Sequence, residues 1–167
     1  MEIAFISIGS NLGDRVANCR TAVEFLKVSA RVLASSSLYE TAPWGKADQP
    51  DFINQVVEIE TELNPLELLA RIETIETRMG RVKTGERWGP SPIDLDIIFY
   101  GNKVMDCDVL TIPHPLMSER AFVLVPLAEI SPGFVHPVLK KKVGELLTIL
   151  DEHGEENRPK IISFEEA

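Results

Sequence analysis

Residues 87–100, with the sequence RWGPSPIDLDIIFY, decide how the rest of this chain is interpreted. The segment begins as a loop rich in Gly and Pro, and it continues as an apolar strand that carries Asp94 and Asp96. Because side chains alternate between the two faces of a strand, the two carboxylates are expected on the same face. The apolar side chains of the alternate positions are expected on the opposite face: Leu95, Ile97 and Phe99.

Two adjacent carboxylates beside a core strand repel each other and lose hydration, which costs several kcal/mol unless something compensates. A divalent cation is the natural compensation, and oxygen ligands suit magnesium. The pair Asp94 and Asp96 is therefore a candidate metal site. A solvated strand end is the alternative for an isolated D-x-D pattern.

Composition favours one folded domain over residues 1–167, since 44% of the 167 residues are hydrophobic. The formal net charge of −9 disfavours nucleic acid and anionic membranes as partners. The two cysteines, Cys19 and Cys107, have no metal-ligand spacing and suggest no disulfide framework.

The N-terminal residues read as a first strand and not as a signal peptide, because they lack a basic region and their apolar run is short. No run approaches the ~20 apolar residues of a membrane-spanning helix. We therefore expect a soluble, cytoplasmic protein, and we expect it to be a monomer.

Hydrophobic periodicity predicts strands and helices in the order β-α-β-β-α-β, which is the ferredoxin-like topology of the α+β class. The second helix has a strong start, with Asn64 as N-cap, Pro65 in the first position and Glu67 in the third, and Gly80 closes it. The expected strands are 2–8, 31–41, 52–61 and 94–100, and the expected helices are 13–28 and 65–79.

Further elements are expected after this unit. Residues 103–112 are expected to form one or two short strands, and residues 118–129 a helix that Pro126 kinks or ends. Residues 143–150 are expected to form a last helix, and residues 153–167 a polar tail.

Basic residues are concentrated immediately before the carboxylate pair of this acidic chain. Cations near a helix C-terminus would account for Arg78 and Arg81, but not for Lys83 and Arg87 in the following loop. Cations next to carboxylates that can hold magnesium are typical of phosphoryl transfer. The later segment adds two candidates, His114 and Arg120.

Several motifs together resemble one family, the 6-hydroxymethyl-7,8-dihydropterin pyrophosphokinases of folate biosynthesis. The most specific is R-W-G-P-x-x-x-D-L-D, which begins at Arg87. The other matching segments are IGSNLG at 8–13, YETAP at 39–43, DQPDFIN at 48–54 and IPHP at 112–115.

This resemblance implies transfer of a pyrophosphoryl group from ATP to the hydroxymethyl group of the pterin, with release of AMP. It implies that Asp94 and Asp96 bind two Mg²⁺ ions, and that Trp88 belongs to a loop that seals the site. The residues implied for catalysis are Arg81, Asp94, Asp96, His114 and Arg120. Those implied for the nucleotide are Glu76, Arg81, Lys83, Arg87, Trp88, Ile97, Thr111, His114 and Arg120.

The resemblance also implies that the pterin stacks between Phe52 and Phe122 while Asn54 binds its edge. Phe52 and Asn54 are two apart on one strand, so a ring could stack on one while the amide of the other pairs with its edge. From periodicity alone, the favoured interpretation is that both Phe residues are core and that His114 is a structural turn residue. The other implied pterin contacts are Thr41, Ala42, Pro43, Trp44 and Asp94.

The chain departs from the family pattern at Ser91 and Thr84, where basic residues are common, and also at Ala42 and Glu73. Three alternatives therefore stay open. They are a nucleotide-binding relative with weakened activity, an RNA-binding module on the same sheet, and a different ATP-dependent transferase.

Overall fold

The computed structural model describes residues 1–42, 48–81, 91–153 and 158–162. Its main sheet has the strand order β5-β1-β4-β3-β8, and β2 also pairs with β4. All neighbouring strands run antiparallel. The strands are β1 (Glu2–Ser10), β2 (Arg31–Ser35), β3 (Tyr39–Thr41), β4 (Phe52–Thr61), β5 (Asp94–Tyr100) and β8 (Lys160–Ile161).

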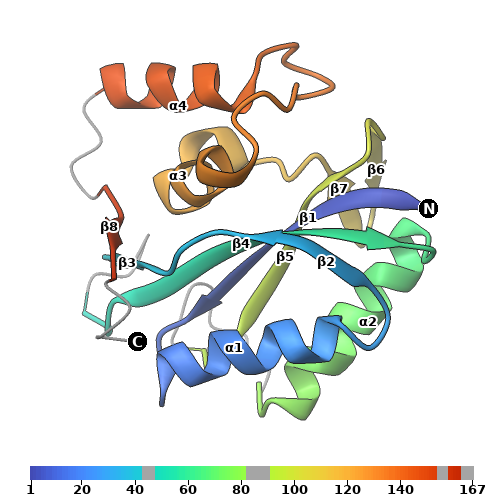
Figure 1. Cartoon of the computed structure of the whole chain (residues 1–167), viewed down its shortest axis with the longest axis vertical. Helices are drawn as coiled ribbons and strands as arrows, with labels where there is room; N and C mark the ends of the chain where they lie inside the picture. Colours follow the sequence, from blue (N-terminus) through green and yellow to red (C-terminus); the bar gives the residue numbers. More distant parts are fainter. Residues whose placement is uncertain (43–47, 82–90, 154–157, 163–167) are drawn as a thin grey trace.

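Helices cover both faces of this sheet, as Figure 1 shows. The helices α1 (Arg15–Leu26) and α2 (Pro65–Arg78) lie on one face, and α3 (Ala121–Ile130) and α4 (Val143–Glu152) lie on the other. The first face buries aliphatic side chains such as Ile6, Ile59 and Ile72. The second buries side chains such as Phe5 and Leu124. The predicted α+β class and β-α-β-β-α-β order are thus confirmed, with a third layer added by the C-terminal helices.

Local signals act as expected at the second helix. Asn64 and Glu67 form a reciprocal capping box, with each side chain bonding the other residue's backbone N–H at 2.9 Å. The helix ends where Gly80 adopts a positive φ of 90°, a conformation that glycine reaches at little cost.

The prediction for Phe99 was wrong, because β5 contains an irregularity. Ala4 and Phe5 pair with Tyr100 and Phe99, whereas Ile6 pairs with Ile97, so Ile98 is an extra residue in β5. Phe99 therefore packs edge-on against Phe5, on the side of α3 and α4. Leu95 and Ile97 keep the predicted face, toward α1 and α2.

The expected strand over 31–41 is two strands, β2 and β3, separated by a short break. Ser36 fills this break, since its hydroxyl accepts a hydrogen bond from the Val56 N–H at 2.9 Å. Glu129 of α3 holds the same region through the Tyr39 hydroxyl, at 2.6 Å, and through Ser37. The break is therefore built into the packing of α3 against the sheet.

The C-terminal half differs from expectation in two further ways. A 3₁₀ turn, η1 (Met117–Glu119), precedes α3, which begins at Ala121 and contains Pro126 in its interior. The segment expected as a polar tail contains β8, which pairs with Tyr39 and Glu40 of β3. The segment expected to form one or two short strands contains β6 (Met105–Cys107) and β7 (Leu110–Ile112), which pair with each other in a separate two-stranded sheet.

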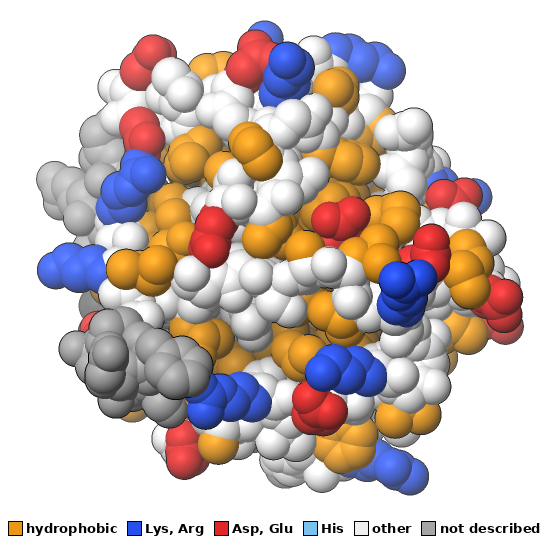
Figure 2. All heavy atoms as spheres, viewed as in Figure 1, with side chains coloured by type: hydrophobic (Ala, Val, Ile, Leu, Met, Phe, Trp, Pro, Cys, Tyr) orange, Lys and Arg blue, Asp and Glu red, His pale blue; other side chains and the backbone are white. Residues whose placement is uncertain are grey.

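The surface in Figure 2 carries acidic and basic side chains interspersed with hydrophobic ones, so the net charge of −9 is not gathered on the face shown. Within the described part of the chain, none of the helices combines the length and the apolar character that crossing a bilayer requires.

A chain that ends after His153 should be less stable than the full chain, because it loses β8 and the Ile162 N–H bond to the Leu38 carbonyl. We expect a loss on the order of 1–3 kcal/mol of unfolding free energy, measured by urea denaturation. A chain that ends after Ile162 is the matched control and should unfold like the full chain. Equal stability of the two shortened chains would contradict this role of β8.

Candidate active site

The predicted site residues meet on the sheet face toward α3, because β1 lies between β4 and β5. Gly9 pairs with Asn54 on one side and with Asp94 on the other. Two residues along, Ser7 pairs with Val56 and with Asp96. Paired residues of neighbouring strands share a face, so the amide of Asn54 and both carboxylates project to the same side.

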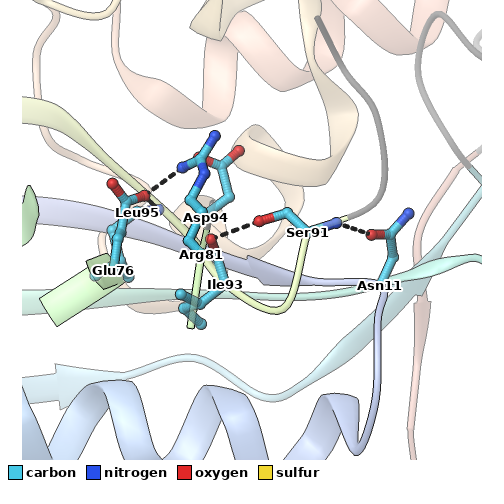
Figure 3. A network of polar contacts seen from close by, with 7 residues as sticks. All are labelled: Asn11, Glu76, Arg81, Ser91, Ile93, Asp94 and Leu95. Carbon is cyan, nitrogen blue, oxygen red and sulfur yellow. Dashed lines mark hydrogen bonds and ion pairs between the residues drawn. The ribbon is translucent and has the colours of Figure 1, made fainter. Parts of the chain in front are cut away.

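Asp94 is held by a basic side chain from the end of α2. The Arg81 guanidinium donates to Asp94 Oδ1 at 2.9 Å and to Glu76 Oε2 at 2.5 Å (Figure 3). The same Glu76 oxygen accepts the Leu95 N–H at 2.9 Å. Burial raises the pKa of Glu76 although both donors oppose the rise. These contacts join the C-terminal end of α2 to the outer edge of β5.

Asp96 is the more buried member of the pair. Burial, together with the negative charge of Asp94, raises the pKa of Asp96 to about 7, although the charge of Arg120 lowers it. The Asp96 carboxylate therefore lacks full compensation in the protein alone, as expected of a cation ligand.

His114 and Arg120 border the carboxylates from the segment before α3. The cis Ile112–Pro113 bond precedes His114, whose Nδ1 accepts the Leu116 N–H at 3.1 Å. Burial and the charge of Arg120 lower the pKa of His114 to about 4, so its imidazole is neutral at pH 7 and carries its proton on Nε2. Arg120 is buried, with its guanidinium carbon 5.4 Å from the centre of the Phe122 ring.

Asn54 is fixed in a buried position next to these charges. Its Nδ2 donates to Thr41 Oγ1 at 3.0 Å, and the residue is 3% exposed. Phe52 lies two residues before it on the same face and is half-buried. Phe122, on α3, is also half-buried and packs beside the second core cluster. Because both rings are only half-buried, part of each is accessible to a ligand.

Asn11 ties three segments together and was not singled out from the sequence. Its Nδ2 donates to Gln49 Oε1 at 2.7 Å and to the Pro50 carbonyl at 3.1 Å. Its Oδ1 accepts the Ser91 N–H at 2.8 Å (Figure 3). Its only signal in the sequence is its place in the IGSNLG motif.

Ser91, where the family commonly has a basic residue, is held inside the protein. It is 7% exposed, its Oγ donates to the Ile93 carbonyl at 2.7 Å, and its own carbonyl accepts the Asn11 N–H at 3.1 Å. The Ser91 side chain therefore faces the protein interior.

Two further predicted residues lie at the edge of β5. The Ile97 side chain is buried on the opposite face, toward α1 and α2, so only its backbone is directed to the site edge. Thr111 is on β7, where its hydroxyl bonds Asp106 Oδ1 at 3.2 Å.

Ala42 is half-buried after β3, and Glu73 is exposed on α2. The remaining predicted residues lie outside the described residues: Pro43, Trp44, Lys83, Thr84, Arg87 and Trp88.

The donor set fits a magnesium ion. Asp94 and Asp96 supply carboxylate oxygens on one face, and the raised pKa of Asp96 reflects uncompensated charge. Among the described residues, no group of three or more His, Cys, Asp or Glu side chains could hold an ion. Mg²⁺ is commonly bound by one or two carboxylates together with substrate phosphates and water, which matches a two-carboxylate site.

Replacement of Ser91 by Arg should destabilise the protein, because the position is buried and the Ser91 hydroxyl is bonded to the Ile93 carbonyl. We expect a loss of roughly 2 kcal/mol or more for Ser91→Arg, against about 1 kcal/mol for Ser91→Ala, which removes only the hydroxyl. Urea unfolding of both variants measures the difference. Equal stability of the two would show that the Ser91 pocket accepts a large cation.

Asp96→Asn should stabilise the metal-free protein in a pH-dependent way. A carboxyl whose pKa is higher in the folded state contributes stability below its unfolded pKa of about 3.9, and this contribution is lost as the pH rises through about 7. The neutral amide avoids that loss, so the gain should be larger at pH 8 than at pH 5, by on the order of 1–2 kcal/mol. Urea unfolding in EDTA at both pH values tests this, and a gain independent of pH would contradict it.

The chain is similar in sequence to known proteins. The family model described as 7,8-dihydro-6-hydroxymethylpterin-pyrophosphokinase matches residues 5–132. A curated 2-amino-4-hydroxy-6-hydroxymethyldihydropteridine pyrophosphokinase of Methylorubrum extorquens is 44% identical over 156 residues, which is 92% of this chain and 97% of that relative. A folic acid synthesis protein of Schizosaccharomyces pombe is 46% identical over 155 residues, 92% of this chain. The chain spans only about a fifth of that fungal protein, 21% of its length.

The fold is also found among solved structures. A Plasmodium falciparum HPPK-DHPS triple mutant matches with a TM-score of 0.74 and 18% identity, over 93% of this chain and 44% of that chain. This likeness concerns the fold alone. The family match covers most of the chain, including the strands that carry Asn54, Asp94 and Asp96. The chain therefore belongs to the 7,8-dihydro-6-hydroxymethylpterin-pyrophosphokinase family.

Proposed function

We propose that this chain transfers a pyrophosphoryl group from ATP to the hydroxymethyl group of 6-hydroxymethyl-7,8-dihydropterin and releases AMP. The observation that carries the proposal is the row Asn54–Gly9–Asp94 across three paired strands. It places an amide that can bind a heterocycle edge beside carboxylates that can bind a metal–phosphate group, on one sheet face. A transfer between two substrates requires this adjacency.

On the phosphate side, Asp94 and Asp96 would bind Mg²⁺, and two ions are expected by the resemblance. When bound, magnesium neutralises phosphate charge and orients the phosphates. Arg81, His114 and Arg120 would contact phosphate oxygens directly. A neutral His114 can donate one hydrogen bond from Nε2, whereas Arg120 adds a fixed positive charge in a buried place, where it acts strongly.

Arg81 has two roles in this proposal. It bonds Asp94 and Glu76, so it partly neutralises the acidic site. Phosphates would compete for the same guanidinium when ATP binds, since Arg81 can pair with either anion. Arg81 thus reduces the electrostatic repulsion between the carboxylates of the site.

The nucleoside would lie at the outer edge of β5. The Leu95 N–H points outward to Glu76, and the backbone of Ile97, two residues along, is directed to the same edge. Thr111 is on β7, which lies against β5. Backbone groups with one hydroxyl can bind the edge of an adenine, which supports the roles expected for Ile97 and Thr111.

On the acceptor side, Asn54 would bind the pterin edge, with its amide supplying both a donor and an acceptor. Phe52 and Phe122 would stack on the ring. Asn54 and the two rings favour a planar heterocycle over a sugar or lipid acceptor, which argues against a different transferase.

Two alternatives lose support. The case for a weakened, nucleotide-binding relative relied on Ser91 and Thr84. The Ser91 side chain faces inward, which weakens that case, whereas Thr84 lies outside the described residues. An RNA-binding sheet of this type stacks bases on an open face, whereas helices cover both faces of this sheet.

Asp96→Ala should abolish pyrophosphoryl transfer, because it removes a proposed metal ligand. It should leave the fold intact, because the buried Asp96 carboxylate destabilises the folded protein. We expect at least a hundredfold loss of kcat, measured as AMP formation from ATP in the presence of Mg²⁺ and the hydroxymethyl dihydropterin. The matched control is Asp108→Ala, in the exposed turn between β6 and β7, which should keep wild-type activity. Turnover of Asp96→Ala within tenfold of wild type would overturn the metal assignment.

A further inference from the structure

We propose that Gly9 is a positioning residue for the pterin: its lack of a side chain leaves the Asn54 carboxamide in the orientation that binds the ring edge. This inference rests on the proposed function and extends it to a residue that does not itself pair with the substrate. Gly9 lies between Asn54 and Asp94 in the sheet, at the boundary of the acceptor and phosphate sides.

The space beside Gly9 is already occupied by the two acceptor-side residues. A Cβ built on Gly9 would lie 2.9 Å from Asn54 Oδ1 and 3.4 Å from Cδ1 of Phe52. Non-bonded carbon atoms attract most at about 3.5–4.0 Å, so a methyl group here would push against the amide. The Gly9 backbone is not in the left-handed region, so the need for glycine at this position is one of space.

Asn54 has little freedom to accommodate such a methyl group. On the side away from Gly9, its Nδ2 donates to Thr41 Oγ1 at 3.0 Å. Rotation of the carboxamide away from residue 9 would strain or break that bond in a buried place, where a lost hydrogen bond is costly. Gly9 and Thr41 therefore hold the amide from opposite sides.

The consequence concerns selectivity for the acceptor. An amide fixed on both sides presents its donor and its acceptor at set positions, so it can distinguish the edge of a pterin from that of another flat ring. A displaced amide would weaken pterin binding but leave nucleotide binding, which uses the other side of β1, unchanged.

The test is Gly9→Ala, with Gly133→Ala as the matched control. A Cβ on Gly133 would meet no atom within 4 Å, so this control adds the same methyl group to open space. Binding of 6-hydroxymethylpterin is measured by calorimetry in Mg²⁺ and an α,β-methylene analogue of ATP, and binding of the analogue is measured alone. We expect Gly9→Ala to raise the pterin Kd at least tenfold and the analogue Kd less than twofold, with no change for Gly133→Ala.

A pterin Kd of Gly9→Ala within twofold of wild type would overturn the inference and leave the proposed function standing. Absence of pterin binding by the wild-type protein would overturn both. If Gly9→Ala does not fold, Thr41→Val tests the same orientation from the other side. It should also raise the pterin Kd several-fold, and wild-type affinity of Thr41→Val would count against the inference.

A double-mutant cycle separates this positioning role from a general effect on the strand. If Gly9 acts through Asn54, the double variant Gly9→Ala/Asn54→Ala should have a pterin Kd within twofold of that of Asn54→Ala alone. The same tenfold factor in both backgrounds would show that the methyl group acts elsewhere and would overturn the assignment.

Discussion

The pairing of β1 with both β4 and β5 is the constraint on which the site depends. Because side chains alternate along a strand, a slip of one residue would turn Asn54 or Asp94 to the opposite face. The β1–β4 register is regular from Glu2 to Ser10, and the irregularity in β5 lies beyond Asp96. The part of the sheet that carries the site is thus kept in register, while the bulge redirects Phe99 into the second core.

The carboxylates of the site lower the folding stability of the protein. Asp96 is buried beside a like charge, and Arg81 and Arg120 compensate for it only in part. Filling this place with apolar residues would suit the fold better. In the proposed function, a cation that arrives with phosphates would complete the compensation, and Asp94 and Asp96 would bind it.

The segments that flank the site are tied to fixed points of the sheet. Asn11 holds Gln49, Pro50 and Ser91, and Arg15 donates to the Asp51 carbonyl at 2.8 Å. In each of these contacts one partner, Asn11 or Arg15, comes from the region directly after β1. The turn after β1 therefore organises the acceptor side and the start of β5 together.

The sequence by itself determined the order of the elements, the capping of α2 and the shared face of Asp94 and Asp96, because these follow from local periodicity and local hydrogen bonds. Only the tertiary structure decided the face of Phe99, the buried place of Ser91, the pairing of β8, the contacts of Asn11 and the lack of space beside Gly9. Each of these depends on contacts between segments far apart in the chain. A bulge, a buried hydroxyl or a missing Cβ has no periodic pattern, so its meaning appears only when the neighbouring strands are in place.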